Sequence, residues 1–201
     1  LYACSATMPE KAKNALLPFF GPDAGTAEEP GREVLRDSIE HWALFSEERK
    51  KTRTLISFIA AVKPRKALVF IDAGDRIGKV AGILQNHTIS AGCLFGGMDK
   101  KARRNSVDDF RKGRIKVLVT SDLAARGLDI PDVSHIIALD TTDGEAYIHR
   151  AGRTARSGKR GVMATIGDEA ELKKLAALEK KLGIVIYPKA LYQGRLERAD
   201  I

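Results

Sequence analysis

Short apolar runs recur along the chain and alternate with segments in which apolar residues return every three to four positions. The first pattern is typical of buried β-strands and the second of amphipathic helices. The predicted strands are Ala67 to Ile71, Ile89 to Phe95, Ile115 to Thr120, Val133 to Leu139 and Val162 to Ile166. Their alternation with helices predicts an α/β domain whose mostly parallel sheet is covered on both faces.

Two segments depart from this pattern. Residues 20–31 are rich in turn-forming residues, mainly glycine and proline, which favours a loop or linker and places a domain boundary there. Residues 1–31 are therefore assigned to a separate unit, 32–190 to the main domain, and 191–201 to a polar tail or the start of a further segment. Between them, Ser46 to Val62 is predicted to be a helix with an acidic first turn.

The charge of +8, from 34 Lys and Arg against 26 Asp and Glu, favours a polyanionic partner: nucleic acid, a membrane surface or an acidic protein. No basic amphipathic helix suggests a membrane surface, and no apolar stretch approaches the roughly 20 residues of a spanning helix, so nucleic acid is the first candidate and no membrane partner is expected. Cys4 and Cys93 lie in apolar runs, which indicates reduced thiols in a cytoplasmic protein. No metal site is expected.

The most informative segment is Tyr147 to Gly158, where a histidine and three arginines lie among small residues. At helical spacing Arg153 and Arg156 share one face, and their forked donors suit the oxygens of a phosphate. The alternative is a solvated basic helix end.

A second segment, Val117 to Ile130, runs from a buried strand into a loop that carries Ser121, Arg126 and Asp129. Ligands of open parallel sheets bind at such carboxyl ends of strands. The alternative is that Arg126 and Asp129 only pair with each other.

Ser121 to Ile130, followed by Tyr147 to Arg156, resembles motifs V and VI of the DEAD-box RNA helicases. Ala67 to Ile71 resembles motif IV, Gly96 to Met98 with Arg103 resembles the next motif, and Ser5 to Thr7 resembles motif III. The resemblance implies a RecA-like three-layer α/β/α fold, with residues 32–190 as the helicase C-terminal RecA-like domain. Residues 1–31 would then be a remnant of the N-terminal RecA-like domain with its linker.

The resemblance also implies roles for particular residues. Arg153 and Arg156 correspond to arginine fingers that reach the triphosphate of ATP, and Asp129 to a residue that contacts its ribose. On the RNA side, backbone contacts that read no sequence are implied for Gly96, Arg103 and Ser121. Coupling between the two domains is implied for His149, Ser5 and Thr7.

Two further segments look like nucleotide motifs. Phe70 to Val80 resembles a Walker A loop, but it is one residue short and Val80 cannot ligate magnesium, so it is interpreted as a degenerate loop. Asp168 to Glu171 resembles a Walker B box but lies after motif VI, where Asp168 and Glu171 fit a helix capping box.

The chain is therefore expected to be the C-terminal half of an ATP-dependent RNA helicase that is inactive alone. ATP with Mg²⁺ would bind only in the full-length protein, and the expected partners are RNA and the N-terminal RecA-like domain. Two alternatives remain: a stand-alone module that binds RNA or docks a protein, and a DNA helicase of the same superfamily.

Overall fold

A computed structural model describes residues 15, 17–19, 35, 37–72, 74–128, 130–156 and 158–199. Eight strands of this part form one sheet in the order β3-β4-β2-β5-β6-β1-β7-β8, in which only the β7–β8 pair is antiparallel. The strands are β1 (Ile39–Phe45), β2 (Ala67–Phe70), β3 (Ala91–Leu94), β4 (Val117–Thr120), β5 (His135–Ala138), β6 (Gly161–Gly167), β7 (Ile186–Tyr192) and β8 (Arg195–Arg198).

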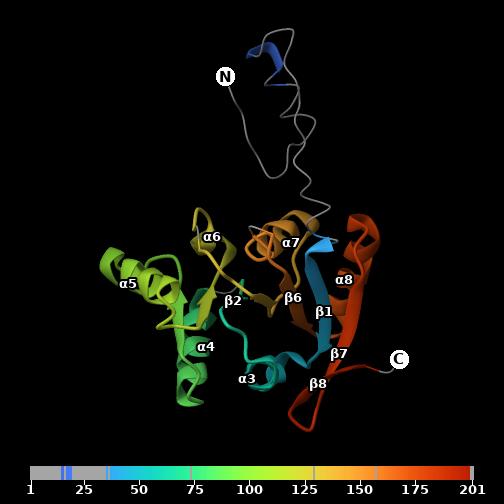
Figure 1. Ribbon diagram of the computed structural model, residues 1–201, viewed down its shortest axis with the longest axis horizontal. Coiled ribbons are helices and arrows are strands. Elements are labelled where there is room, and N and C mark those ends of the chain that lie inside the picture. Colours follow the sequence, from blue (N-terminus) through green and yellow to red (C-terminus); the bar gives the residue numbers. More distant parts are fainter. Residues whose placement is uncertain are drawn as a thin grey trace.

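Helices cover both faces of this sheet (Figure 1). The helices are α3 (Lys51–Val62), α4 (Gly74–Asn86), α5 (Lys100–Arg111), α6 (Asp122–Ala125), α7 (Gly144–Ala151) and α8 (Glu169–Leu182), with short 3₁₀ turns η1 (Leu17–Phe19) and η2 (Glu48–Lys50). Buried side chains of α3 and α4 share one core cluster, and those of α5, α6, α7 and α8 share the other. The predicted three-layer RecA-like arrangement is confirmed.

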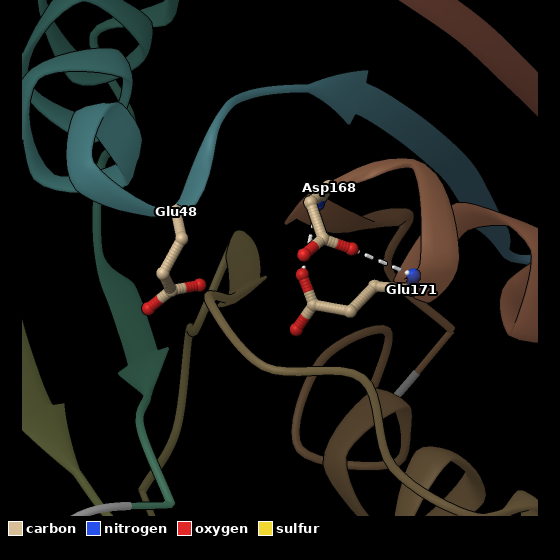
Figure 2. Close-up of side chains that lie close together, drawn as sticks. All are labelled: Glu48, Asp168 and Glu171. Carbon is tan, nitrogen blue, oxygen red and sulfur yellow. Dashed lines mark hydrogen bonds between the residues drawn. The ribbon is translucent and has the colours of Figure 1, made fainter.

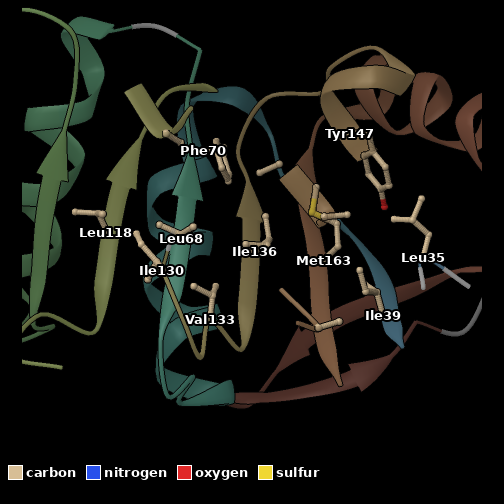
Figure 3. Close-up of a cluster of buried hydrophobic side chains, with 14 of the residues drawn as sticks. Leu35, Ile39, Leu68, Phe70, Leu118, Ile130, Val133, Ile136, Tyr147 and Met163 are labelled. Atoms are coloured by element: carbon tan, nitrogen blue, oxygen red, sulfur yellow. The ribbon is translucent and has the colours of Figure 1, made fainter. Parts of the chain in front are cut away.

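The central strands supply alternate side chains to the two cores. In β2, Leu68 and Phe70 belong to the cluster under α5 and α7, whereas Ala67 and Val69 face α3 and α4. Figure 3 shows the first cluster, to which Phe70, Ile136 and Met163 from three strands contribute together with Tyr147 of α7. Burial on both faces explains why these strands are continuous apolar runs.

All five strands predicted from the sequence are present, shortened or lengthened by a few residues. Three others were missed. β1 alternates only partly, since His41 is buried as well as Ile39 and Leu44. Both ring nitrogens of the buried His41 have hydrogen-bond partners. Nδ1 lies 2.7 Å from Tyr147 Oη, and Nε2 lies 2.8 Å from the Leu35 carbonyl oxygen. Hydrophobic periodicity does not detect this strand, because it counts the buried histidine as a polar residue.

The C-terminal region differs from its prediction. Residues 191–198, expected to be a polar tail or the start of a further segment, contribute to the β7–β8 hairpin. Leu191 and Leu196 pack on the α3 side of the sheet, and Lys189 Nζ lies 5.3 Å from the centre of a Trp42 ring. Few apolar side chains are needed because β8 is an edge strand.

Helix boundaries were predicted with mixed success. The helix expected from Ser46 begins at Lys51, after the turn η2, and the Ser46 hydroxyl instead bonds to Thr54 Oγ1 at 2.8 Å. The capping box of α8 is confirmed: Asp168 accepts from the Glu171 amide at 2.9 Å, and the Glu171 side chain accepts from the Asp168 amide at 2.8 Å. In the part of the chain that the structure describes, we find no helix long and apolar enough to cross a membrane.

Candidate nucleotide and RNA site

Arg150 lies at the centre of the polar contacts beyond the carboxyl ends of the strands. It comes from the last turn of α7 and is 1% exposed. Nε donates to both carboxylate oxygens of Asp122 at 2.9 and 3.1 Å, Nη1 donates to the Asp140 carbonyl at 2.9 Å, and Nη2 donates to Asp72 Oδ1 at 2.5 Å. The guanidinium lies 5.2 Å from the centre of the Phe70 ring.

The parallel sheet explains why these groups meet. Asp72, Asp122 and Asp140 follow β2, β4 and β5, which are neighbours in the order β4-β2-β5. Parallel neighbours end on the same edge, so residues 10 to 78 positions from Arg150 converge there. Burial raises the pKa of Asp72, and the Asp140 and Asp122 carboxylates add to this effect, while Arg150 opposes it.

A second group of charges continues along the same edge. Lys51 is fully buried, and its Nζ lies 2.6 Å from a carboxylate oxygen of both Glu48 and Glu171. Burial acts to lower the pKa of Lys51, but hydrogen bonds to these two carboxylates outweigh it and raise the pKa above its usual value. Arg76 lies 3.2 Å from Glu48 and 3.8 Å from Asp140, which joins the two groups.

Glu48, Asp168 and Glu171 bring their carboxylates close together, as Figure 2 shows. Such a group has the donors that a divalent cation requires. However, the Lys51 ammonium already pairs with two of the three, and Asp168 and Glu171 are committed to the cap of α8. These contacts give the cluster a structural role.

The same contacts test whether this edge fits Mg-ATP. A phosphate-binding loop presents main-chain N–H groups and a lysine to an anion. Here the loop after β2 begins with Asp72, whose carboxylate lies beside two others, and Lys79 is exposed and 4.0 Å from Asp75. An edge lined by carboxylates repels phosphate, so this loop does not fit the triphosphate of ATP, in agreement with a degenerate loop.

The arginine-rich segment after α7 is held by neighbouring loops. Thr154, which is 2% exposed, donates through Oγ1 to the Val133 carbonyl at 2.5 Å. Arg153 Nη1 donates to the Leu128 carbonyl at 3.2 Å, and Arg156 Nε donates to the Gly152 carbonyl at 3.2 Å. Both arginines are half-buried, but α7 ends at Ala151 and Ala155 has a left-handed φ of 54°, so the helical spacing predicted for Arg153 and Arg156 does not continue to them.

Close packing of this turn against β6 depends on a glycine. A Cβ at Gly161, the first residue of β6, would lie 2.2 Å from Thr154 Oγ1 and 2.6 Å from Thr154 Cγ2. No side chain larger than hydrogen fits without moving Thr154. Gly161 thus fixes the position from which Arg153 and Arg156 extend.

The residues predicted to contact RNA lie on two adjacent elements. Arg103 of α5 donates through Nη2 to the Ala124 carbonyl at the end of α6, at 2.9 Å. Ser121 is the N-cap of α6, and its hydroxyl accepts from the Ala124 amide at 3.4 Å. Gly96 is exposed in the turn before α5, with open space where a side chain would stand. The structure brings Arg103 and Ser121 together through α6.

Four other residues were predicted from the sequence to bind the nucleotide or to couple the two domains: His149, Asp129, Ser5 and Thr7. His149 is half-buried in the last turn of α7, next to Arg150. Asp129, Ser5 and Thr7 lie outside the residues that the structure describes.

Sequence reasoning did not identify the role of Arg150. Its burial and its four partners were not apparent from the chain, where it is one of three arginines in a row of small residues. The available signal was an aspartate directly after, or one residue beyond, each of three predicted strands, since carboxylates gathered at one edge repel one another unless a cation lies between them.

The fold and this site define a RecA-like α/β domain with an arginine-rich turn and a degenerate nucleotide loop. Residues 50–158 match the helicase conserved C-terminal domain, so the chain belongs to that family. The relatives that it matches are DEAD-box RNA helicases, and it corresponds to their C-terminal RecA-like domain.

Among these relatives, CshC of Bacillus cereus, a DEAD-box ATP-dependent RNA helicase, is 33% identical over 157 residues, which cover 78% of this chain and 40% of the relative. CshB of Bacillus subtilis, also a DEAD-box ATP-dependent RNA helicase, is 32% identical over 197 residues. These residues cover 98% of this chain and 44% of the relative. The chain thus spans about two fifths of the length of these relatives.

Solved structures agree with this assignment. The E. coli DEAD-box protein SrmB, in a complex with regulator of ribonuclease activity A, superposes with a TM-score of 0.74 at 30% identity, covering 80% of this chain and 95% of that chain. S. cerevisiae Dbp5 bound to RNA and ADP BeF₃ gives a TM-score of 0.75 at 29% identity, covering 92% of this chain and 50% of that chain.

Proposed function

We propose that this chain is the C-terminal half of an ATP-dependent RNA helicase, in which it supplies two arginine fingers and part of an RNA-backbone surface. ATP and Mg²⁺ would be held mainly by a preceding RecA-like domain, because the strand-end edge of this chain carries carboxylates in place of a phosphate cradle. Arg153 and Arg156 would then stabilise the charge that develops on the transferred phosphate, an effect of about 10³ to 10⁵ in rate for such fingers.

The observation that carries the proposal is the connection made by Arg150. It joins α6, which begins next to Ser121, to the helix that leads into Arg153 and Arg156. A contact of RNA phosphate with Ser121 and a contact of ATP with the fingers would therefore act on two ends of one rigid unit. A helicase requires such coupling between its two ligands.

Support for the RNA surface comes from Arg103. Its contact with the end of α6 orients one face of α5, and two exposed lysines, Lys100 and Lys101, precede it on the same helix. Phosphate contacts of this kind give affinity that falls with salt and reads no sequence. RNA would be preferred to DNA only through its 2′-hydroxyl.

The test compares ATPase activity with and without single-stranded RNA for the chain alone and for the chain joined to a nucleotide-binding RecA-like domain of a DEAD-box relative. We expect no turnover from the chain alone, and RNA-stimulated turnover from the joined protein that Arg153→Ala lowers by about a thousandfold. Arg195→Ala, an exposed arginine of β8 at the far sheet edge, is the matched control and leaves the rate within about twofold.

Turnover by the chain alone contradicts the proposal, as does unchanged activity of the Arg153→Ala protein. RNA binding by the chain, combined with a joined protein in which Arg153 is dispensable, would favour an RNA-binding module instead.

A further inference from the structure

The segment that carries Arg153 and Arg156 lies outside regular secondary structure. Helix α7 ends at Ala151 and β6 begins at Gly161, so residues 152–156, called the finger turn below, have no helix or strand to hold them. A group that stabilises charge in a transition state must keep its position, since a displacement of about 1 Å can cost a hundredfold in rate. The contacts that fix the finger turn therefore bear on its function.

Thr154 attaches the finger turn to the core of the domain. Its side chain is 2% exposed, and its hydroxyl donates to the carbonyl of Val133, a residue of the core cluster in the loop before β5. Its amide donates to the Ala151 carbonyl at 3.0 Å. Thr154 Oγ1 and Cγ2 occupy the space where a side chain at Gly161 would stand. One residue thus joins the end of α7, the loop before β5 and the start of β6.

The backbone next to Thr154 is strained. Ala155, between the two arginines, is 7% exposed and has a left-handed φ of 54°. Residues with a Cβ rarely adopt this region, and they persist there where the surrounding structure holds them, often at functional sites. The contacts of Thr154, the preceding residue, hold this bend. The bend in turn sets the direction of Arg156 relative to Arg153.

The hydroxyl of Thr154 is not explained by packing alone. A valine has the same shape and would fill the same space without a polar group to bury. The hydroxyl adds a bond with one direction, to a carbonyl whose own residue, Val133, is 5% exposed. A buried hydrogen bond specifies one arrangement, whereas apolar contact tolerates several. The hydroxyl thus selects one position of the finger turn.

We propose that Thr154 is a positioning residue for the two fingers: its hydroxyl bond to Val133 holds Arg153 and Arg156 where they reach the transferred phosphate. The inference rests on the proposed function, because it takes both arginines to act on ATP. It goes further in making the rate depend on a buried residue that does not touch the nucleotide. Loss of the hydroxyl should slow the chemical step and leave ATP binding nearly unchanged, since fingers act mainly in the transition state.

The test measures RNA-stimulated ATPase activity of the joined protein with three substitutions of Thr154. Thr154→Val keeps the shape of the side chain and loses the hydroxyl, so we expect kcat to fall about tenfold while KM for ATP stays within about twofold. Thr154→Ser keeps the hydroxyl and should retain at least about half of the parent's kcat. Thr154→Ala is too small to clash with its neighbours and should lose as much as valine, which provides the test where Thr154→Val fails to fold.

The matched control is Thr165→Val. Thr165 of β6 is 1% exposed, and its hydroxyl has no hydrogen-bond partner among the described residues, so the change should leave kcat within about twofold. Urea unfolding of each 201-residue variant shows whether the domain is folded under the assay conditions. The NMR signal of Arg156 Nε–H, which donates to the Gly152 carbonyl, should shift in Thr154→Val and return in Thr154→Ser.

Three results would overturn the inference: kcat of both Thr154→Val and Thr154→Ala within about twofold of the parent, an equal loss in Thr154→Val and Thr154→Ser, or a rise in KM without a change in kcat. Each would leave Thr154 with the structural role of satisfying a buried carbonyl. Failure of the proposed function is detected separately, with Arg153→Ala. If that variant keeps its turnover, neither proposal stands. If it is inactive while Thr154→Val turns over at the parental rate, only the positioning role is wrong.

Discussion

Replacement of Arg150 by alanine is predicted to be the most damaging single change at the strand-end edge. The variant would leave Asp72 and Asp122 as neighbouring carboxylates without the cation that joins them. It would also remove a donor from the Asp140 carbonyl and the contact with the Phe70 ring.

The magnitude follows from the burial of each group. Loss of one partner of a buried ion pair costs about 3 to 5 kcal/mol. Arg150 is buried, but the side chains of Asp72 and Asp122 are 52% and 34% exposed, so water partly compensates them and the lower end applies. The lost cation–π contact contributes about 1 kcal/mol. Arg150→Ala should therefore lower the free energy of unfolding by about 3 to 4 kcal/mol, a large share of a typical domain's stability.

The assay is urea unfolding of the chain at neutral pH, followed by circular dichroism and by the fluorescence of Trp42, the single tryptophan. Arg150→Met separates charge from packing, because it keeps most of the side-chain volume and should lose nearly as much stability as alanine. Arg104→Ala, exposed on α5 and 3.8 Å from Asp108, is the surface control and should cost less than about 0.5 kcal/mol.

A rescue variant gives the decisive comparison. If unpaired carboxylates cause the loss, Asp72→Asn in the Arg150→Met background should recover at least about 1 kcal/mol. The reasoning is refuted if Arg150→Ala costs less than about 1 kcal/mol, or if Asp72→Asn destabilises the variant further.

Three further changes have definite expected outcomes. Gly161→Ala should lower the free energy of unfolding by about 1 to 3 kcal/mol, because its Cβ overlaps Thr154; a urea midpoint equal to that of the parent chain would contradict this. Burial, with a contribution from Arg65, lowers the pKa of His135 from 6.5 to about 4, so the unfolded chain binds more protons between these values. Stability should then fall by at most about 3 kcal/mol as pH drops through this window, and His135→Gln should flatten the slope. Lys51→Met should cost about 3 kcal/mol, because two carboxylates lose their buried partner; an unchanged midpoint would argue against an ion-pair role.

The sequence determined the local features of this protein. Alternating strands and helices predicted the covered parallel sheet, and Asp168 with Glu171 predicted the cap of α8, because both signals depend on residues a few positions apart. The amino-acid sequences of residues 121–130 and 147–156 likewise indicated the family, because each resembles one of its motifs.

Only the tertiary structure decided which distant groups meet. Parallel register joined Arg150 to Asp72, 78 residues earlier, and brought Arg65 level with Arg160 at the opposite end of the sheet. The β7–β8 hairpin was missed because an edge strand needs few buried side chains. Hydrophobic periodicity records whether a residue faces a core, but it contains no information on strand order, and strand order sets the partners of every residue at the sheet's two ends.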